Sequence, residues 1–524
     1  MSEALFSAVS MAAIISFLVA AALAPSPKIN RASLIVEIAG ILALLMALIG
    51  LGGVFLTGAP IAGADGGKGL AAFLRIDALS AIMFTLVSFV GLVVLRYSRN
   101  YLAGDPRQPI FLSRLCLTLA SVTLLVTAGD VFVLFGAWVA TSLTLHQLLV
   151  YRHERSAAII AARKKFIVAR VGDAALGVAA VLLATTFGSS NISEILTAAE
   201  AARAADDATV GAGVAAMLIA AAAALKSAQF PTHGWLTEVM ETPTPVSALL
   251  HAGVVNAGGF LVIRFADVML ISTPAMHALA LIGGFTALFG SIVMLTQTSV
   301  KASLAYSTIA QMGFMLLQCG LGAFASATLH LVAHSLYKAH AFLSSGRIVN
   351  AIKSKQKAPA PNSVLVFASF IGALGIYYAI AAMFGGVAKS PAILTLGALF
   401  IMGTFIFLTD AARKAAVFVR ALAITVLASV SYFALQTATA AIMKGAVPPP
   451  PAPDVTGLSV MGITLISFGA VTLVQILSPA RAGRMAQTAY VHAANGLYAN
   501  ALFDRLVGAL RLRRNAISSG DVTS

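Results

Sequence analysis

Four basic side chains that can carry protons stand within long apolar stretches of this sequence: Lys226, His251, His334 and Lys338. An ionisable group inside a bilayer costs free energy, so such groups are rare and usually functional. A lysine buried beside a carboxylate can bind and release a proton near neutral pH, because burial and the neighbouring charge act on its pKa in opposite directions. Histidine titrates in the same range. These residue types predict a proton path.

Lys226 follows an alanine-rich run over residues 211–225 and precedes Pro231. Proline interrupts a helix because it lacks the backbone N–H. Within a membrane, a broken helix is tolerated where the freed carbonyl groups face protein or a wet cavity, and transporters place binding sites at such breaks. We therefore predict a pathway lysine at a broken helix. The alternative is a structural lysine that reaches the membrane surface.

The second motif runs from Glu241 through Pro243 and Pro245 to His251. The prolines fit the start of a helix, where a missing N–H costs little. Glu241 precedes that start, where the helix dipole favours a negative charge. His251 lies about two turns further on and can relay protons. Its alternative role is a hydrogen bond between two helices.

The third motif places His330, His334 and Lys338 four residues apart, on one helix face, and His340 follows. Two histidines at this spacing can bind a metal, but no carboxylate lies nearby and the HExxH pattern is absent. A proton wire along the helix is the better interpretation. We predict no metal site in this chain.

Three side chains are possible charge partners of the buried lysines: Asp173, Glu241 and His330. Asp173 follows Arg170 at i+3, so the two can form an ion pair within one helix. Such a pair can also be structural, since opposite charges in a membrane neutralise one another.

The composition indicates which elements position these groups. The chain has 524 residues, of which 59% are hydrophobic and 10% charged, and its mean hydropathy is +0.94. Soluble domains carry about 25% charged residues, so a soluble enzyme, a nucleic-acid-binding module and a disordered scaffold are excluded. Because a spanning helix needs about 20 apolar residues, we predict an all-α polytopic membrane protein with 14–15 spans. The fifteen candidates are 4–24, 33–57, 76–96, 110–128, 131–151, 166–187, 211–230, 243–266, 276–297, 300–322, 325–347, 362–384, 391–410, 415–438 and 456–479.

The basic residues predict the orientation of these spans. Of the 34 Lys and Arg residues, 25 follow odd-numbered spans, 6 lie in the other joints and 3 (Arg170, Lys226 and Lys338) lie inside spans. Cytoplasmic loops are enriched in Lys and Arg. We therefore expect a bacterial inner (plasma) membrane protein with its N-terminus outside and its C-terminus in the cytoplasm, and the net charge of +15 needs no anionic partner.

After Arg481, apolar residues alternate with arginines in the pattern of an amphipathic helix. Such a helix either lies on the cytoplasmic membrane face or docks a soluble partner. The candidate docking residues are Tyr490, His492, Asn495 and Tyr498.

Several of these stretches resemble the proton-conducting membrane transporter family, which comprises the antiporter-like subunits of respiratory complex I and the large subunits of multisubunit Na+/H+ antiporters. The resemblance is carried by residues 226–231, 241–251, 304–313 and 334–339, and residues 77–80 and 97–101 are similar to the NuoL-like (and MrpA-like) large-subunit branch. It implies two inverted five-helix repeats with broken helices, in which Lys226 and Lys338 are the repeat lysines and His251 and His334 relay protons between them.

On this basis we divide the chain into five regions. They are N-terminal helices (1–109), a first five-helix repeat (110–266), a second repeat (276–410), C-terminal helices (411–480) and a cytoplasmic tail (481–524).

One departure from complex I subunits stands out. Their fifth span has a glutamate after its tryptophan, whereas here Val139 follows Trp138 and no carboxylate is near. The counter-ion of Lys226 is therefore left open between Glu241 and Asp173.

Residues 137–143, 162–166, 251–259 and 490–498 instead resemble DabB, the membrane subunit of DAB-type inorganic carbon transporters. This resemblance implies a non-enzymatic subunit that conducts H+ or Na+ and powers CO2 hydration to bicarbonate on a soluble, zinc-bearing DabA-like partner at the cytoplasmic face. Any zinc would then belong to the partner, and no cofactor is expected in this chain. The alternatives are a proton-pumping subunit of a complex I or membrane hydrogenase type enzyme, a Na+/H+ antiporter subunit, and a membrane anchor.

Overall fold

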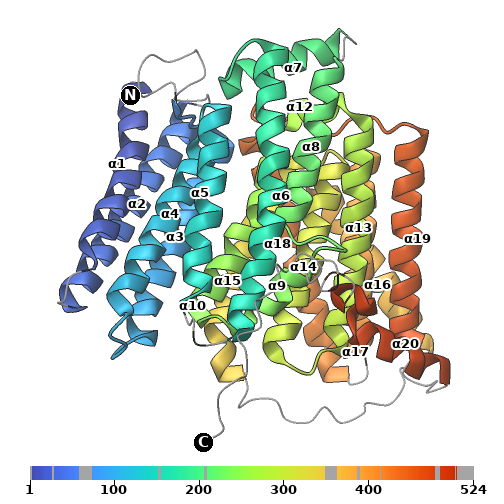
Figure 1. Cartoon of the computed structure of the whole chain (residues 1–524). Coiled ribbons are helices and arrows are strands. Elements are labelled where there is room, and N and C mark those ends of the chain that lie inside the picture. The colour runs from blue at the N-terminus through green and yellow to red at the C-terminus, as the bar shows by residue number, and fades with distance from the viewer. Residues whose placement is uncertain are drawn as a thin grey trace, which may run out of the picture.

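The chain folds into a bundle of long helices, drawn from a computed structural model in Figure 1. The structure describes residues 3–25, 29–57, 73–151, 154, 156–205, 209–348, 363–385, 390–412, 415–477, 484–501, 503 and 505. In chain order its helices are α1 (Glu3–Leu23), α2 (Ile29–Thr57), α3 (Ala78–Tyr101), α4 (Gln108–Thr127), α5 (Val131–Leu149), α6 (Ser156–Phe187), α7 (Ile192–Ala204), α8 (Val210–Lys226), α9 (Gly234–Glu238), α10 (Thr244–Ala252), α11 (Ala257–Arg264), α12 (Ala266–Ile271), α13 (Thr273–Thr296), α14 (Val300–Gly320), α15 (Phe324–Ile348), α16 (Ser363–Met383), α17 (Pro391–Ala411), α18 (Ala415–Ile442), α19 (Val455–Leu477) and α20 (Arg484–Ala494).

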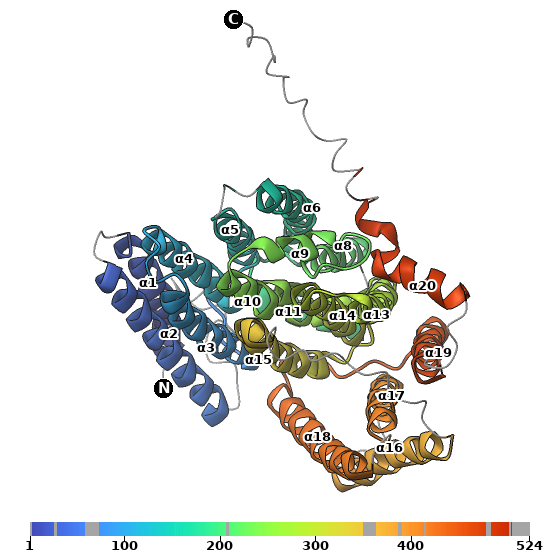
Figure 2. The same cartoon turned by 90° about the horizontal axis from the view of Figure 1, so that it is seen from below.

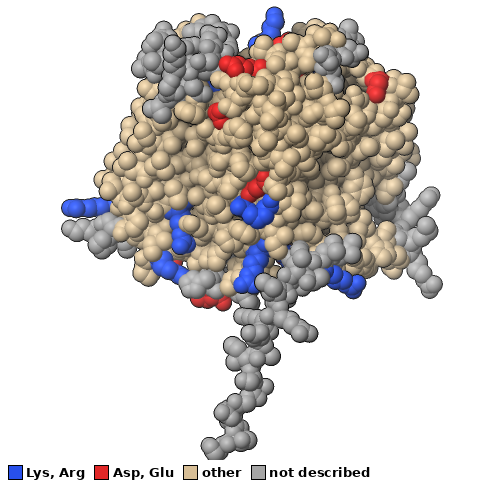
Figure 3. Space-filling view, turned by 45° about the horizontal axis from the view of Figure 1, so that its top comes forward, with Lys and Arg blue, Asp and Glu red and all other residues tan. Residues whose placement is uncertain are grey.

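Each predicted span overlaps one of these helices or a pair of consecutive helices. Within the described residues, eleven helical segments are long and apolar enough to cross a membrane, and α8 and most of α1 are shorter apolar helices. Most of the surface in Figure 3 is uncharged, with Lys and Arg mainly in its lower part and Asp and Glu mainly in its upper part. The prediction of an all-α polytopic membrane protein is confirmed.

The sixth predicted span is too short at its start. We expected it to begin at residue 166, but α6 begins at Ser156 and continues to Phe187. The prediction stopped at the first charged residues, because charges normally mark the end of an apolar span. The alanines at 157, 158, 161 and 162 favour a helix on the N-terminal side of these charges. Lys164 and Lys165 therefore lie within a helix and not in a joint.

Two spans are interrupted by short irregular segments. The seventh predicted span (211–230) covers α8 and the start of an irregular segment at residues 227–233, which α9 and a 3-10 turn (Val239–Glu241) follow. The eighth consists of α10 and α11, separated by Gly253 and a second 3-10 turn (Val254–Asn256). In the second predicted repeat, α13 to α17 are continuous over their described bounds, so Lys338 lies on an unbroken helix, α15.

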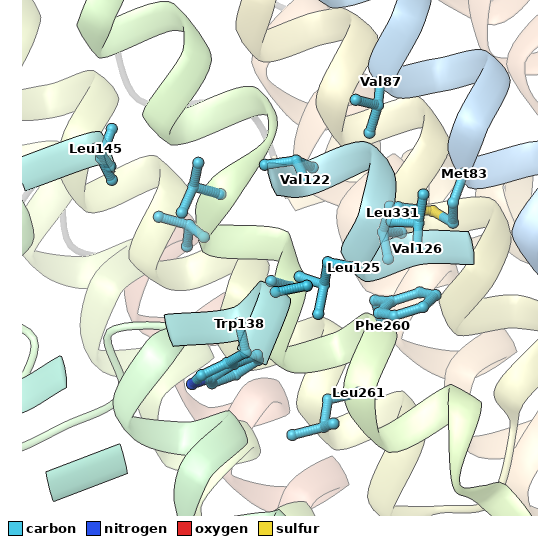
Figure 4. Packing of buried hydrophobic residues seen from close by; sticks show 14 of the residues in the cluster. Met83, Val87, Val122, Leu125, Val126, Trp138, Leu145, Phe260, Leu261 and Leu331 are labelled. Carbon is cyan, nitrogen blue, oxygen red and sulfur yellow. The ribbon is translucent and has the colours of Figure 1, made fainter. Parts of the chain in front are cut away.

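Large buried side chains hold the first half of the bundle together. Trp138 of α5, Phe260 of α11 and Met83 of α3 belong to one continuous core, whose packing Figure 4 shows from close by. Helices α16, α17 and α18 share a separate, smaller core. In the view of Figure 2, these three helices lie to one side of α13, α14 and α15.

Small residues let several helices approach closely. A Cβ added to Gly313 of α14 would lie 2.5 Å from the backbone nitrogen of Ala287 in α13, and one added to Gly320 would lie 2.3 Å from that of Ala280. Membrane helices associate through such small-residue contacts, because lipid supplies little hydrophobic driving force between them. The α13–α14 pair is thus a close backbone-to-backbone contact that positions the inner face of α14.

A buried ion network closes the end of the bundle that carries α7 and α12, at the top of Figure 1. The Asp77 carboxylate accepts hydrogen bonds from Arg75 at 2.8 Å and from Arg264 at 2.6 Å, and Arg75 also donates to Ser193 of α7. We call this end the α7 end. The opposite end, which carries α9 and α20, is called the α20 end.

The tail differs from its prediction as one amphipathic helix. Helix α20 ends at Ala494, and Leu497 and Tyr498 adopt positive φ angles of 52° and 60°. Residues in this left-handed region cannot continue a right-handed helix. The tail residues beyond Arg505 lie outside the described part of the chain.

Candidate proton-transfer site

Lys226 is the last residue of α8, at the point where the seventh span breaks. Ala228 adopts a positive φ of 51°, and the chain leaves the helix. The groups freed by the break find partners: Gln229 Nε2 donates to the Ser227 carbonyl at 2.8 Å, and Ser227 Oγ donates to the Val255 carbonyl at 2.9 Å. The break therefore starts four residues before Pro231 and is satisfied by nearby polar groups, as a membrane interior requires.

The Lys226 side chain is buried and lies against an aromatic ring. Its Nζ is 4.3 Å from the centre of the Trp138 ring on α5, a cation–π contact. The side chain is 8% exposed, and Nζ has no hydrogen-bond partner among the described residues. A cavity of about 20 Å³ adjoins it. A water molecule needs about 10–15 Å³ of such volume, so the cavity can hold the partner that Nζ lacks.

Asp173 of α6 is the carboxylate that acts electrostatically on Lys226. It also pairs with Arg170 on the same helix, with 2.5 Å between Nη2 and Oδ2. Lys226 and Arg170 thus both interact electrostatically with one carboxylate, which lies on α6 and not on α5. The side chain of Glu241, the other candidate counter-ion, lies outside the described residues.

His251, near the end of α10, is fully buried between α14 and α15. Its Nδ1 lies 3.0 Å from Thr308 Oγ1, and its ring stacks on Phe342 with 4.3 Å between ring centres. Thr308 Oγ1 donates a hydrogen bond to the Leu304 carbonyl at 3.0 Å, so it accepts a hydrogen bond from Nδ1–H of His251. In a neutral ring the lone pair is then on Nε2, which has no partner in the described part of the structure and is free to take up a proton.

Lys338 of α15 lies close to this histidine and shares a backbone group with its partner. Its Nζ donates to Ser307 Oγ at 2.8 Å and to the Leu304 carbonyl at 3.1 Å. The same carbonyl accepts the Thr308 hydroxyl. Lys338 and His251 are therefore linked through the Leu304 carbonyl and the Thr308 hydroxyl by three hydrogen bonds.

His334 and His330 continue this group along α15. His334 Nε2 donates to the His251 carbonyl at 3.3 Å, and the His334 and His330 rings are 6.1 Å apart. His330 Nδ1 lies 2.9 Å from Gln318 Oε1 of α14. His330 thus belongs with His334 and Gln318, and it is not among the groups that act on Lys226.

The predicted site residues form two groups. Lys226 and Asp173 lie together against Trp138, and His251, His334, His330 and Lys338 lie together between α10, α14 and α15. In the described residues no direct hydrogen bond joins the groups. The cavity at Lys226 is also lined by Leu250 and Val254, which flank His251 in sequence, so α10 carries the boundary between them.

Sequence reasoning missed several polar members of both groups. Lys165 was assigned to a joint although it is buried on α6, and the hydroxyl groups of Ser307 and Thr308 carried no signal because neutral polar residues are common in membrane helices. The only available signal for Lys165 was the unusual pair of adjacent lysines in the DabB-like stretch 162–166.

The four candidate docking residues of the tail (Tyr490, His492, Asn495 and Tyr498) are all exposed. The tail itself packs on the α20 end through residues between and beyond them. Asn500 Nδ2 donates to Thr237 Oγ1 of α9 at 3.4 Å, and Gln297 Nε2 donates to the Ala494 carbonyl at 3.4 Å.

Comparison with known proteins identifies the family. The model of the NADH:quinone oxidoreductase/Mrp antiporter transmembrane family matches residues 128–357, and that of the complex I chain 5 N-terminus matches residues 69–112. The probable inorganic carbon transporter subunit DabB2 of Halothiobacillus neapolitanus is 39% identical over 448 residues, which cover 83% of this chain and 80% of that protein. The chain belongs to this antiporter family. It is an antiporter-like membrane subunit similar to DabB.

Other relatives of this subunit match it over shorter stretches. The probable inorganic carbon transporter subunit DabB of Hydrogenovibrio crunogenus is 44% identical over 55% of this chain and 56% of its own length. NADH-quinone oxidoreductase subunit L of Mycobacterium tuberculosis is 38% identical over 54% of this chain and 44% of its own length. The chain thus spans about half the length of these two relatives.

Two solved structures share the fold of this subunit. A chain of the Mrp complex from Dietzia sp. matches 97% of it, and 60% of that chain, with a TM-score of 0.61 and 25% identity. A chain of the membrane-bound sulfane sulfur reductase, an archaeal respiratory complex, matches 97% of it, and 96% of that chain, with a TM-score of 0.58 and 20% identity. The second likeness is one of fold alone.

Proposed function

We propose that this chain is the H+- or Na+-translocating membrane subunit of an inorganic carbon accumulation complex. In this role it couples the ion motive force to CO2 hydration on a soluble DabA-like partner at the cytoplasmic face. The observation that carries the proposal is the pair of buried ionisable groups, around Lys226 and around Lys338, in a chain 39% identical to a DabB2 subunit over most of both lengths.

In this proposal Lys226 takes up a proton before it reaches His251. Asp173 stabilises the charged ammonium, and the Trp138 ring supports it without holding it in a fixed hydrogen bond. The free Nε2 of His251 then accepts the proton. A positive charge on Lys338 disfavours a positive charge on His251, because the two side chains are connected through the Leu304 carbonyl and the Thr308 hydroxyl. Like charges repel strongly in a medium of low dielectric constant, which drives the proton onward.

We also propose that the α20 end faces the cytoplasm and that the exposed tail residues bind the partner. Tyrosine and histidine are well suited to a docking surface, since each presents both apolar area and a polar atom. The catalytic zinc would belong to the partner, where a carbonic-anhydrase-like reaction needs it, and this chain would supply the driving force.

Growth in air tests the proposal. We expect co-expression with the neighbouring partner gene to rescue a host that lacks carbonic anhydrase, and Lys226→Ala to abolish the rescue because the first ion-binding amine is lost. The matched control is Lys444→Ala, which removes an exposed lysine at the far end of α18 and should leave rescue intact. Co-purification of the two subunits checks assembly. A fully assembled complex that never rescues growth would contradict the proposal.

A second candidate is a proton-pumping subunit of a complex I or membrane hydrogenase type enzyme. The identity of 38% with NADH-quinone oxidoreductase subunit L favours it. Under this alternative the chain co-purifies with flavin and iron–sulfur proteins. A Na+/H+ antiporter subunit, suggested by the likeness to the Mrp complex chain, would instead make a deletion strain sensitive to sodium.

A further inference from the structure

Lys165 is a further buried lysine of the bundle, and the function proposed above does not use it. Its side chain lies on α6, is almost fully buried, and points to α5, where Nζ donates to the Ser142 carbonyl at 2.9 Å and to Ser142 Oγ at 3.0 Å. Ser142 is four residues after Trp138, or about one helical turn. Lys165 is therefore held about one turn away from the ring that supports Lys226.

The two lysines share one cavity. The space of about 20 Å³ beside Lys226 is lined by both Lys165 and Lys226, and its other lining residues are uncharged. This volume accommodates one water molecule. Both lysine side chains line this space, and the Lys226 amine has no hydrogen-bond partner in the described residues.

The surrounding charges do not balance two protonated lysines. The groups that act on Lys165 are Lys226, Asp173 and Arg170, so three cations bear on a single carboxylate. His146 of α5, one turn beyond Ser142, is a further titratable group, and the charges that act on it are the cations Lys165 and Arg170. Because neighbouring cations in a low-dielectric interior raise each other's free energy, the protonation of the two lysines is coupled.

Lys164, which precedes Lys165 in the sequence, forms an ion pair with a carboxylate of α9. Lys164 Nζ lies 2.6 Å from Glu238 Oε1 of α9, and the Glu238 side chain is 27% exposed. Glu238 of α9 contacts Lys164, the neighbour of Lys165 in sequence, and Lys165 shares a cavity with Lys226. These contacts fit an entry route for protons.

We propose that Lys165 is a second proton-carrying residue, which receives protons from the α20 end and exchanges them with Lys226 through a water in the shared cavity. In each step the Lys165 ammonium gives one proton to the water, and the water gives one of its own to the neutral Lys226 amine. The Lys165 amine and the Lys226 ammonium remain, so one positive charge is kept and no electron moves. This inference rests on the proposed function, with H+ as the ion. It adds Lys165 as the proton carrier that precedes Lys226 in the path.

The test uses the complete complex and three substitutions at this position, with flux measured as ion-driven bicarbonate accumulation over a range of pH. Lys165→Gln keeps a donor for Ser142 but cannot titrate, and Lys165→Arg keeps the charge but does not release its proton. We expect both to lower the flux by at least about tenfold. Lys165→His restores a titratable group of lower ordinary pKa, about 6.5, so its flux should return with an optimum at lower pH.

Two control variants make the outcome decisive. Arg163→Gln removes an exposed charge two residues away and should leave the flux unchanged. Lys226→Ala tests the proposed function separately: if that variant stays active, the proposed function fails, whatever Lys165 does. If Lys226→Ala is inactive but the assembled Lys165→Gln or Lys165→Arg complex is fully active, only the role of Lys165 is overturned. Should Lys165→Gln fail to assemble, the comparison of the Arg and His variants decides alone.

Discussion

At the scale of single residues, the counter-charge of Lys226 lies on a different helix from the aromatic ring that it contacts. Val139 follows Trp138 on α5, and the carboxylate that acts on Lys226 is Asp173 of α6. Because Arg170 uses the same carboxylate, Lys226 shares its counter-ion. A carboxylate that is shared with Arg170 stabilises the Lys226 ammonium less than a dedicated one would. Lys226 therefore holds its proton less firmly, which suits a residue that must also release it.

We predict that Asp173→Asn lowers ion-driven bicarbonate accumulation by about tenfold or more, or about 1.4 kcal/mol in transport free-energy terms. The substitution keeps the size of the side chain and removes its charge, so Lys226 and Arg170 lose their common partner. Glu194→Gln, an exposed carboxylate of α7, is the control. Unchanged accumulation in an assembled Asp173→Asn complex would show that the Arg170–Asp173 pair is only structural.

The same scale shows what a sequence can say about a site. Lys226, His251, His334 and Lys338 could be singled out because an ionisable residue is conspicuous in an apolar stretch. Lys165 could not, since its neighbours Arg163 and Lys164 make it look like part of a membrane boundary. The roles of Ser307 and Thr308 could not be predicted from the sequence either, because only the packing of α14 against α10 and α15 brings their hydroxyl groups to a partner.

At the scale of helices, apolar length predicts spans well and helix ends poorly. Each of the fifteen predicted spans overlaps a helix, and eleven helical segments of the described residues are long and apolar enough to cross a membrane, yet α6 extends ten residues beyond its predicted start. The backbone hydrogen bonds of a helix can continue beyond the lipid boundary. The apolar sequence pattern ends at that boundary, so it does not show where the helix ends. The break after Lys226 was predicted from Pro231, but the irregular segment starts at Ser227, because the chain needs several residues to leave and re-enter a helix.

The contact between α13 and α14 also positions the site, since α14 supplies the partners of His251 and Lys338. We predict that Gly313→Ala destabilises the protein by about 1–3 kcal/mol, a typical cost of overpacking. The new Cβ would meet the backbone of Ala287, which cannot rotate away. Thermal unfolding in detergent measures the effect. Gly375→Ala on α16, which has open space around it, is the matched control and should not lower the unfolding temperature.

At the scale of the whole molecule, the two ends of the bundle are built differently. Asp77 joins Arg75 and Arg264 in a buried network at the α7 end, where backbone bridges also connect Leu74 with Ala128 and Asp130 with Asn191. At the α20 end, the tail is held to α9 and α13 by hydrogen bonds as long as 3.4 Å. The tail is therefore attached to the bundle by weaker hydrogen bonds than those that join the helices at the α7 end.

We predict that Asp77→Asn destabilises the protein by about 3–5 kcal/mol, because it leaves two buried guanidinium groups without their counter-charge. The loss should appear as a lower unfolding temperature and a lower yield of assembled complex. Replacing Arg264 by Met in the same protein should recover part of it. Asp105→Asn, a less buried carboxylate beside Arg107, serves as the comparison, and an equal loss there would contradict the role of the network.

The closed α7 end restricts how ions can cross this protein. Large halves that swing past one another at this end would have to separate Asp77 and Arg75 from Arg264 and Ser193 in every cycle and then bury these groups again. We expect the scaffold to stay still during turnover. Uptake and release then depend on side-chain rotation and on the arrival and departure of single waters around a rigid frame, with any larger movement confined to the tail and the short helix beneath it.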